Sequence, residues 1–407
     1  MNKYTVYGDS VDEYIKKNYL NKIIKSFVRD INPIAIILFG GFGKGEGSVY
    51  FKDGNPIPYN DFDFYIVTKK KLSDEKLNKI SMNASREIGM GGLEIAYYPE
   101  EGYNSNKFFH VDVRSIPYNN LNNLMSIQRY YELKYGSQII YGNKNVLNKI
   151  KEIKPSDIPP SDGLRNLFNK LHTMLLGLRK GYNEDQRKIR IFWSYKCYIS
   201  ICESLLILNK KFAPTAIERN KIFSEIYRES FPELYQKLPS LSEKVKKATN
   251  FKLKLDFNLD DDKLWNEALR DIIIVFEYYL EKITGSRNIS YAINKKLPYI
   301  YFKPFLKEKF GFNLFPLQYG LNLLYFNILR KNDRLYFRPL LNWRDIGLRL
   351  ILPIYYLLKF KNNPNTKNLN KAYCELKKFI IVEKKDFWYL RERALKAYGL
   401  YYEQRLL

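Results

Sequence analysis

The sequence predicts an α+β fold, in which a small mixed β-sheet with flanking helices is followed by a mainly α-helical region. A short β-branched run at Ile34–Phe39 and an alternating run around Asp61 and Asp63 have the spacing of strands. Beyond a proline-rich stretch at 154–162, apolar residues recur at helical spacing. The chain has 407 residues, of which 45% are hydrophobic and 16% aromatic. It is therefore long and apolar enough for two or three domains with real cores.

The first part of the chain alternates between helical and extended patterns. Apolar residues at helical spacing predict an amphipathic helix over Ser10–Asp30, which leads into the first strand. A second helix is expected from the N-cap Ser73 to a break at Gly89. The other expected elements are strands at Leu93–Tyr98 and Phe108–Val113, helices at Leu121–Lys134 and Val146–Ile153, and an apolar run at Ile139–Asn143.

Composition changes at Lys154–Asp162, where three prolines with Ser and Asp suit neither helix nor strand. This stretch predicts a linker at 154–162 between a first domain over 1–153 and a helical domain over 163–289, with a helical aromatic and basic region over 290–407. The helices expected after it are Gly163–Arg179, Gln186–Asn209, Pro214–Tyr227 and Asp260–Thr284. Ile346–Phe360 is the most lipid-like run, but Arg349 and Pro353 interrupt it. It predicts a buried helix, with contact to a membrane surface as the alternative.

The region between the two first strands carries the most chemical information. Asp61 and Asp63 are two apart on a strand, so they project from one face, whereas Phe62 and Phe64 point into a core. Neighbouring carboxylates repel each other unless a cation lies between them, and Mg²⁺ suits such oxygen ligands. The five glycines between Gly40 and Gly47 allow backbone N–H groups to approach an anion. A solvated strand face and an ordinary turn are the alternatives.

Two motifs resemble a known family. The run Gly40-Gly41-x-Gly43-Lys44-Gly45, followed by Asn60-Asp61-Phe62-Asp63, resembles the signature of the DNA polymerase β-type nucleotidyltransferase superfamily. The resemblance covers about the first third of the chain. The gap at Val49–Tyr59 is longer than usual, and a hairpin turning at Asp53-Gly54-Asn55-Pro56 would accommodate it. The resemblance implies that the small mixed sheet is a nucleotidyltransferase domain.

It also implies a set of site residues. In this family a third carboxylate arrives on a later strand, and Asp112 is the residue expected to supply it, with Glu94 as the alternative. The carboxylates would hold Mg²⁺ or Mn²⁺, and the glycines would bind the phosphates of a nucleoside triphosphate. The metal and catalytic set is Asp61, Asp63 and Asp112, and the nucleotide-binding set is Gly40, Gly41, Lys44, Lys134 and Ser137. For Lys134 and Ser137, an ordinary helix end is an equally good interpretation.

The implied activity is metal-dependent transfer of a nucleoside monophosphate to a hydroxyl group of RNA, protein or a small molecule, with release of pyrophosphate. The absence of a G-K-[ST] run leading into a helix excludes a P-loop. A catalytically silent nucleic-acid-binding or assembly protein on the same fold is the alternative, and a membrane-surface protein is a third. The sequence does not identify the acceptor, the preferred nucleotide or the oligomeric state.

Charge and composition bound the possible partners. Lys and Arg number 68 against 43 Asp and Glu, a net charge of +25 that favours polyanions such as nucleic acid, although a Lys-rich proteome gives the same excess. Only two histidines are present, so a zinc site with several His ligands is not expected. The unpaired Cys197, Cys202 and Cys374 predict reduced core residues of a cytoplasmic protein. No secretory signal or transmembrane segment is expected.

Overall fold

The chain folds into two compact units that interleave along the sequence. A computed structural model describes residues 3–89, 111–297, 346–378 and 380–406. One unit comprises Met1–Ile158 and Gly181–Asp261, and the other comprises Pro159–Lys180 and Asp262–Leu407. The chain first passes from one unit to the other after Ile158, which lies inside the predicted linker at 154–162. The predicted domain boundaries at 153, 162 and 289 stay predictions.

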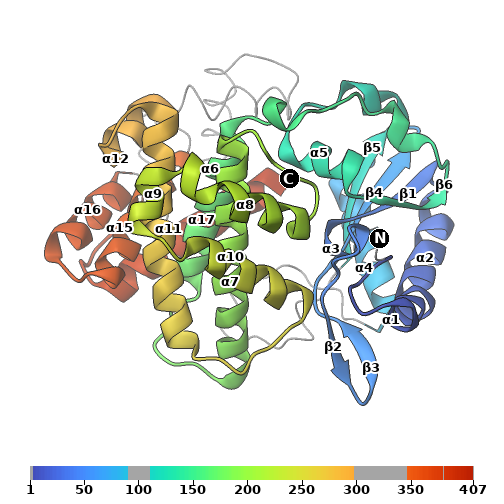
Figure 1. Cartoon of the computed structure of the whole chain (residues 1–407), viewed down its shortest axis with the longest axis horizontal. Helices are drawn as coiled ribbons and strands as arrows, with labels where there is room; N and C mark the ends of the chain where they lie inside the picture. The colour runs from blue at the N-terminus through green and yellow to red at the C-terminus, as the bar shows by residue number, and fades with distance from the viewer. Residues whose placement is uncertain (1–2, 90–110, 298–345, 379, 407) are drawn as a thin grey trace. The chain divides into compact units, whose positions relative to one another are not determined.

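A four-stranded mixed sheet forms the centre of the first unit (Figure 1). Its strand order is β5-β4-β1-β6. The middle strands β1 and β4 are antiparallel, β6 pairs antiparallel with β1, and β5 runs parallel to β4. The strands are β1 (Ala35–Phe39), β4 (Phe62–Thr68), β5 (Val111–Pro117) and β6 (Gln138–Gly142). The predicted α+β class with a small mixed sheet is confirmed.

Helices cover one face of this sheet. Figure 1 shows α1 and α2 beside the strands, and a π-helical turn at Lys16–Leu20 joins the two helices. Every second residue of β4, Phe62 and Phe64 among them, enters the core under these helices. The predicted N-cap Ser73 accepts a hydrogen bond from the backbone N–H of Lys76. The covering helices are α1 (Asp9–Ile15), α2 (Asn21–Ile31) and α4 (Asp74–Glu87).

The long gap between the glycines and the carboxylates forms the expected hairpin. Strands β2 (Val49–Lys52) and β3 (Asn55–Pro58) pair antiparallel. The two residues between them, Asp53 and Gly54, both have left-handed backbone angles, with φ of 50° and 76°. Asp-Gly is a preferred pair for such a tight turn. The insertion is therefore an ordered hairpin that projects beside the sheet (Figure 1).

Some predicted elements differ from the structure. Helix α5 spans only Gln128–Tyr135, and a 3₁₀ turn at Tyr118–Asn123 precedes it, so the helix predicted from Leu121 begins seven residues later. Four asparagines in that turn explain the delay, because their side chains compete with helical backbone bonds. The helix predicted over Val146–Ile153 is a 3₁₀ turn at Val146–Lys149. The strand expected at Leu93–Tyr98, and residues 108–110 of the next, lie outside the described residues.

Four helices complete the first unit. They are α7 (Glu184–Leu208), α8 (Ala216–Ser230), α9 (Pro232–Lys237) and α10 (Leu241–Leu253). The first two were expected from periodicity, whereas α9 and α10 were not. Within the described part of the chain, α7 is the one helix long and apolar enough to cross a membrane, and 61% of its most apolar window is buried inside the protein. Its length and composition also fit the core helix that it forms here.

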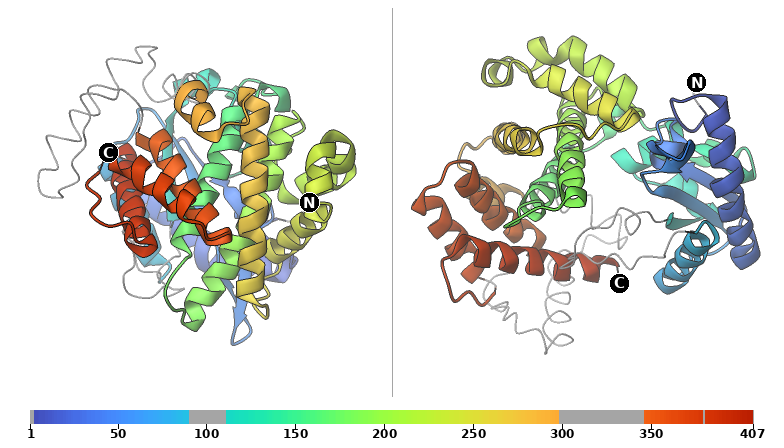
Figure 2. Two further views of the ribbon diagram at one scale, coloured as in Figure 1. Left: turned by 90° about the vertical axis from the view of Figure 1, so that its left-hand side faces the viewer. Right: turned by 90° about the horizontal axis from the view of Figure 1, so that it is seen from below.

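The second unit is helical in its described parts. Helix α15 packs against α6, α16 and α17, as the red and green helices in Figure 2 show. Helix α6 begins inside the predicted linker, because Pro160 is tolerated in a first turn. Helix α15 is buried as predicted, whereas Cys374 on α16 is exposed, so the prediction that it is a core residue was wrong. The helices are α6 (Pro160–Leu176), α11 (Asp261–Thr284), α12 (Ile289–Tyr291), α15 (Ile346–Asn362), α16 (Thr366–Lys377) and α17 (Phe387–Leu406).

Candidate functional site

Two of the predicted carboxylates lie side by side on the sheet. Asp63 of β4 is the register partner of Asp112 in the parallel strand β5. Both are half-buried, whereas the residues on either side of each are buried. Because neighbouring side chains on a strand point to opposite faces, the two carboxylates project from the face away from α2 and α4. Register partners on adjacent strands are about 5 Å apart. The parallel pairing therefore brings Asp63 and Asp112 together.

The end of β1 passes directly under this pair. Phe39 is the antiparallel partner of Asp63, and Gly40 follows it with a left-handed φ of 64°. A Cβ atom at Gly40 would lie 2.0 Å from Oδ2 of Asp63. Glycine is thus required both by the backbone angle and by the approach of the carboxylate. From Gly40 the chain enters the short helical turn α3 (Gly40–Gly43) in place of the open loop that was predicted.

The remaining predicted carboxylate, Asp61, immediately precedes β4. In the described residues, no group of three or more His, Cys, Asp or Glu side chains is placed to hold a metal ion. The alternative ligand Glu94 lies outside those residues. Asp63 and Asp112 still fit a hard divalent cation in their donor atoms, since Mg²⁺ binds through one or two carboxylates and completes its shell with water and phosphate oxygens. The glycine under Asp63 leaves the backbone side of that carboxylate without a side chain.

A cation lies beside Asp112 on the same strand. Nη2 of Arg114 is 3.2 Å from Oδ2 of Asp112, and the two residues share a face of β5. The Arg114 side chain is 44% exposed. Burial would lower the pKa of Arg114, but Tyr65 and the carboxylates Asp112 and Asp63 raise it above its ordinary value. The candidate site therefore holds a fixed positive charge next to its carboxylate pair.

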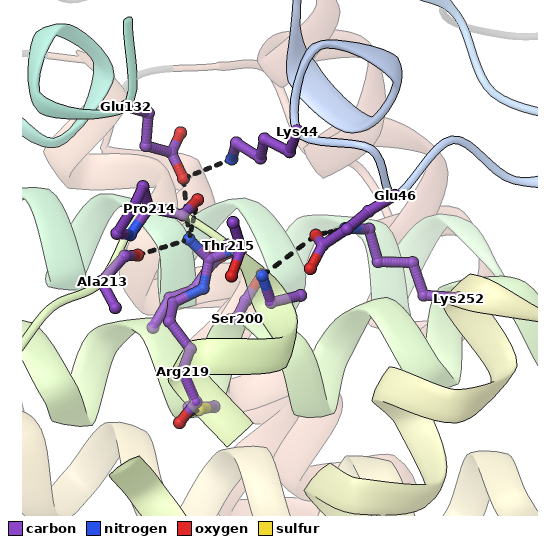
Figure 3. Close-up of polar contacts among 12 residues, drawn as sticks. Lys44, Glu46, Glu132, Ser200, Ala213, Pro214, Thr215, Arg219 and Lys252 are labelled. Carbon is purple, nitrogen blue, oxygen red and sulfur yellow. Dashed lines mark hydrogen bonds and ion pairs between the residues drawn. The ribbon is translucent and has the colours of Figure 1, made fainter. Parts of the chain in front are cut away.

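Lys44, which was expected to contact phosphate, points into the protein. Its Nζ lies 2.7 Å from Oε1 of Glu132 on α5, and its side chain is 7% exposed. Nη1 of Arg219 on α8 binds the same oxygen at 2.8 Å (Figure 3). Nη2 of Arg219 binds Glu203 at 2.9 Å. Burial alone would raise the pKa of Glu132, but Lys44 and Arg219 lower it below its ordinary value. In this conformation Lys44 anchors the glycine segment to α5 and α8.

A second buried charge pair involves Glu46. Its carboxylate accepts hydrogen bonds from the backbone N–H groups of Ala216 and Ile217, the first residues of α8, at 3.0 and 2.9 Å. Nζ of Lys252, near the end of α10, lies 2.7 Å from Oε2 of Glu46 (Figure 3). Burial would raise the pKa of Glu46, but Lys252 and the two N–H groups lower it to about 2. Glu46 is therefore ionised throughout the neutral range.

Lys134 and Ser137 lie at the end of α5. The ammonium of Lys134 donates to the carbonyl of Ile150, and the hydroxyl of Ser137 donates to the carbonyl of Leu133. The Ser137 contact is local to the end of α5, as at an ordinary helix end, whereas the Lys134 contact joins α5 to the segment after β6. The nucleotide contacts predicted for Lys44, Lys134 and Ser137 stay predictions.

Comparison with known proteins gives a weak likeness at the level of the fold. One similar solved structure is a spectinomycin adenyltransferase from Enterococcus faecialis with ATP and spectinomycin. The two chains are 17% identical in sequence, and their structures superpose with a TM-score of 0.34 over 62% of this chain and 97% of that chain. No protein-family model and no curated protein sequence matches. The likeness adds no residue to the site.

Several charged residues around the glycines were missed by sequence reasoning. They are Glu46, Glu132, Arg219 and Lys252, whose partners are far away in sequence. These four left no signal, because a buried ion pair between distant segments leaves no periodic pattern. The place of Arg114 beside Asp112 does follow from the sequence, since residues two apart on a strand share a face.

Proposed function

We propose that this chain is a divalent-metal-dependent nucleotidyltransferase, which transfers a nucleoside monophosphate from a nucleoside triphosphate to a hydroxyl group and releases pyrophosphate. The observation that carries the proposal is the Asp63–Asp112 register pair above Gly40. A pair of half-buried carboxylates on adjacent strands, next to backbone without a side chain, suits a metal-bound triphosphate.

Each residue has a role that follows from its place. Asp63 and Asp112, with Asp61 two residues before Asp63, would hold the cation. When bound, the cation neutralises charge on the triphosphate and on the departing pyrophosphate. Gly40 lies against Asp63 and Gly41 follows it, and both would allow phosphate oxygens to approach the backbone.

The acceptor hydroxyl needs a group that takes its proton. We assign this role to Asp112, because it lies on β5, at the end of the strand order, and has Arg114 as its neighbour. Arg114 fixes one oxygen of Asp112 by a charge-assisted contact, which leaves the other oxygen for the proton. Catalysis of this kind relies mainly on positioning and on charge neutralisation.

The test is transfer of label from α-labelled nucleotides. The full chain is incubated with each of the four nucleoside triphosphates and Mg²⁺ or Mn²⁺, first alone, then with total RNA, and then with a panel of hydroxylated small molecules. We expect label on one acceptor class, and we expect a chelator to abolish transfer. The Asp61→Asn/Asp63→Asn variant should keep its fold by circular dichroism and lose transfer.

Two outcomes would contradict the proposal. One is transfer by the Asp61→Asn/Asp63→Asn variant at the wild-type rate. The other is binding of nucleic acid that depends steeply on salt with no consumption of any nucleotide, which would favour a catalytically silent nucleic-acid-binding protein and would account for the net charge of +25.

A further inference from the structure

The glycine segment is held in place by a buried carboxylate of its own. Glu46 is 1% exposed, and its two oxygens make three contacts to α8 and α10. Its partners are 170 to 206 residues away in sequence. A buried carboxylate that is paired and hydrogen-bonded at both oxygens cannot shift without leaving charges unpaired. Residue 46 is therefore a fixed point of the segment.

The N-terminus of α8 is built to receive this carboxylate. Thr215 caps the helix and forms a capping box with Glu218. The capping box does not bind the N–H groups of Ala216 and Ile217, and these groups have no acceptor within the helix. Glu46 accepts from both of them. A negative charge at this helix end is also favoured by the helix dipole.

Helix α10 also contacts this part of the glycine segment, at Glu46 and Ser48. The hydroxyl of Ser48 donates to the carbonyl of Lys252 at 2.5 Å, while the side chain of Lys252 binds Glu46 at 2.7 Å. Burial lowers the pKa of Lys252 and Glu46 opposes that effect. One residue of α10 thus fixes two residues of the segment, one by its backbone and one by its charge.

The fixed point is connected directly to the glycines of the site. The backbone N–H of Glu46 donates to the carbonyl of Gly41 at 2.9 Å. The ring of Phe42 fills the space beside Gly47, where a Cβ would lie 2.2 Å from it. A shift of Glu46 therefore moves Gly41, and with it the backbone next to Asp63.

We propose that Glu46 and Lys252 are positioning residues of the nucleotide site, through which helices α8 and α10 set the place of Gly40 and Gly41 relative to Asp63. The inference rests on the proposed function in one respect, since the positioned backbone is the part assigned to the triphosphate. It adds that the affinity for nucleotide depends on two side chains that never touch it.

The test removes both charges at once. Glu46→Gln alone would leave Lys252 as an unpaired buried cation, which is strongly destabilising, whereas replacing both members of a buried pair is often tolerated. The variant is therefore Glu46→Gln/Lys252→Met in the full chain. Its matched control is Arg190→Met/Asp261→Asn, which removes another buried ion pair of the same unit, 2.8 Å long. Asp261 also binds Arg187, whose side chain is 51% exposed and can be solvated when this contact is lost.

Two readouts separate positioning from general stability. Amide hydrogen exchange over residues 40–48 should become at least about 10-fold faster in the Glu46→Gln/Lys252→Met variant, while exchange in β1 and α2 stays at the wild-type rate. The KM for the nucleoside triphosphate should rise about 10-fold or more, with kcat within about 3-fold of wild type, as expected when binding geometry is lost. The control should change neither quantity.

Wild-type exchange over residues 40–48 in a folded Glu46→Gln/Lys252→Met variant would overturn the inference. An equal rise of KM in the control would also overturn it, because the effect would then come from stability. Failure of the proposed function looks different, since the wild-type chain would bind and consume no nucleotide. The exchange measurement needs no nucleotide, so it decides on Glu46 in that case as well.

Discussion

The carboxylate of Asp63 lies against the α-carbon of Gly40, so closely that a Cβ there would be 2.0 Å from Oδ2. The contact joins the end of β1 to the middle of the candidate site. It also places the backbone of the glycine segment directly against the carboxylate that we propose as a metal ligand.

Gly40→Ala should therefore abolish nucleotide transfer. The new methyl group must displace the Asp63 carboxylate, and alanine at a φ of 64° is strained as well. Gly54→Ala is the matched control, because Gly54 also has a left-handed φ, of 76°, but a Cβ there meets nothing within 4 Å. Both variants should lose roughly 1 kcal/mol of stability from the backbone. Label transfer measures the difference, and equal activity of the two variants would contradict the role given to this contact.

Asp112→Asn should reduce transfer by about 100-fold or more, because it removes both a ligand and the proposed proton acceptor. Its free energy of unfolding should stay within about 1 kcal/mol of the wild-type value, since Asp112 is half-buried and its partner Arg114 is 44% exposed. Asp53→Asn at the hairpin turn is the control, because asparagine tolerates its left-handed φ of 50°. Transfer by Asp112→Asn within a few-fold of the control would remove Asp112 from the site.

Arg219→Ala should destabilise the first unit by roughly 3–5 kcal/mol. The Arg219 side chain is 4% exposed and pairs with both Glu132 and Glu203, so its loss leaves buried carboxylates without their partner. Urea unfolding measures the change. Lys221→Ala, on an exposed position of the same helix, should be neutral within about 0.5 kcal/mol. A loss below about 1 kcal/mol for Arg219→Ala would show that water replaces these contacts.

His172 should make stability depend on pH below neutrality. Its ring stacks on Tyr398 at 3.4 Å, and in the described structure its Nε2 has no hydrogen-bond partner. Burial lowers its pKa to about 3, and the cations Arg391 and Lys170 add to the effect. The unfolded chain, with a His pKa of about 6.5, then binds more protons between these two values. The free energy of unfolding should therefore fall as pH is lowered from 6.5 toward 3.

The slope should be on the order of 1 kcal/mol per pH unit between pH 6 and 4. His172→Phe keeps an aromatic ring against Tyr398 and removes the titration, so its urea unfolding should lose that part of the slope. Arg391 and Lys170 stay charged over this range and contribute none of it. An unchanged slope in His172→Phe would mean that His172 is protonated in the folded protein.

Local patterns predicted the parts of the fold that depend on local rules. The strands at Ile34–Phe39 and around Asp63, the hairpin turn at Asp53-Gly54 and the helix over Ser10–Asp30 all follow from spacing and turn residues. The alternation of Phe62, Asp63 and Phe64 between the faces of β4 was predicted for the same reason.

The arrangement of the site required information that no local pattern holds. That Asp63 faces Asp112 depends on β4 and β5 being parallel neighbours, which sequence spacing cannot fix. Lys44 was expected to face phosphate because a lysine in a glycine segment can do so. Its flexible side chain turns the other way, toward a partner 88 residues later. The direction of the Lys44 side chain is set by Glu132, which belongs to no motif that the sequence shows.

The interleaving of the two units has a consequence for the order in which the protein can fold during synthesis. The strands β1, β4, β5 and β6 are complete once residue 142 is made, yet Glu46 has no partner until α8 and Lys252 follow. By then α6, which belongs to the second unit, has already been made. Because domains usually fold as continuous segments from the N-terminus, the glycine segment should be among the last parts of the first unit to become ordered. A fragment that stops at residue 158 should contain the four described strands of the sheet and lack a fixed conformation of the glycine segment.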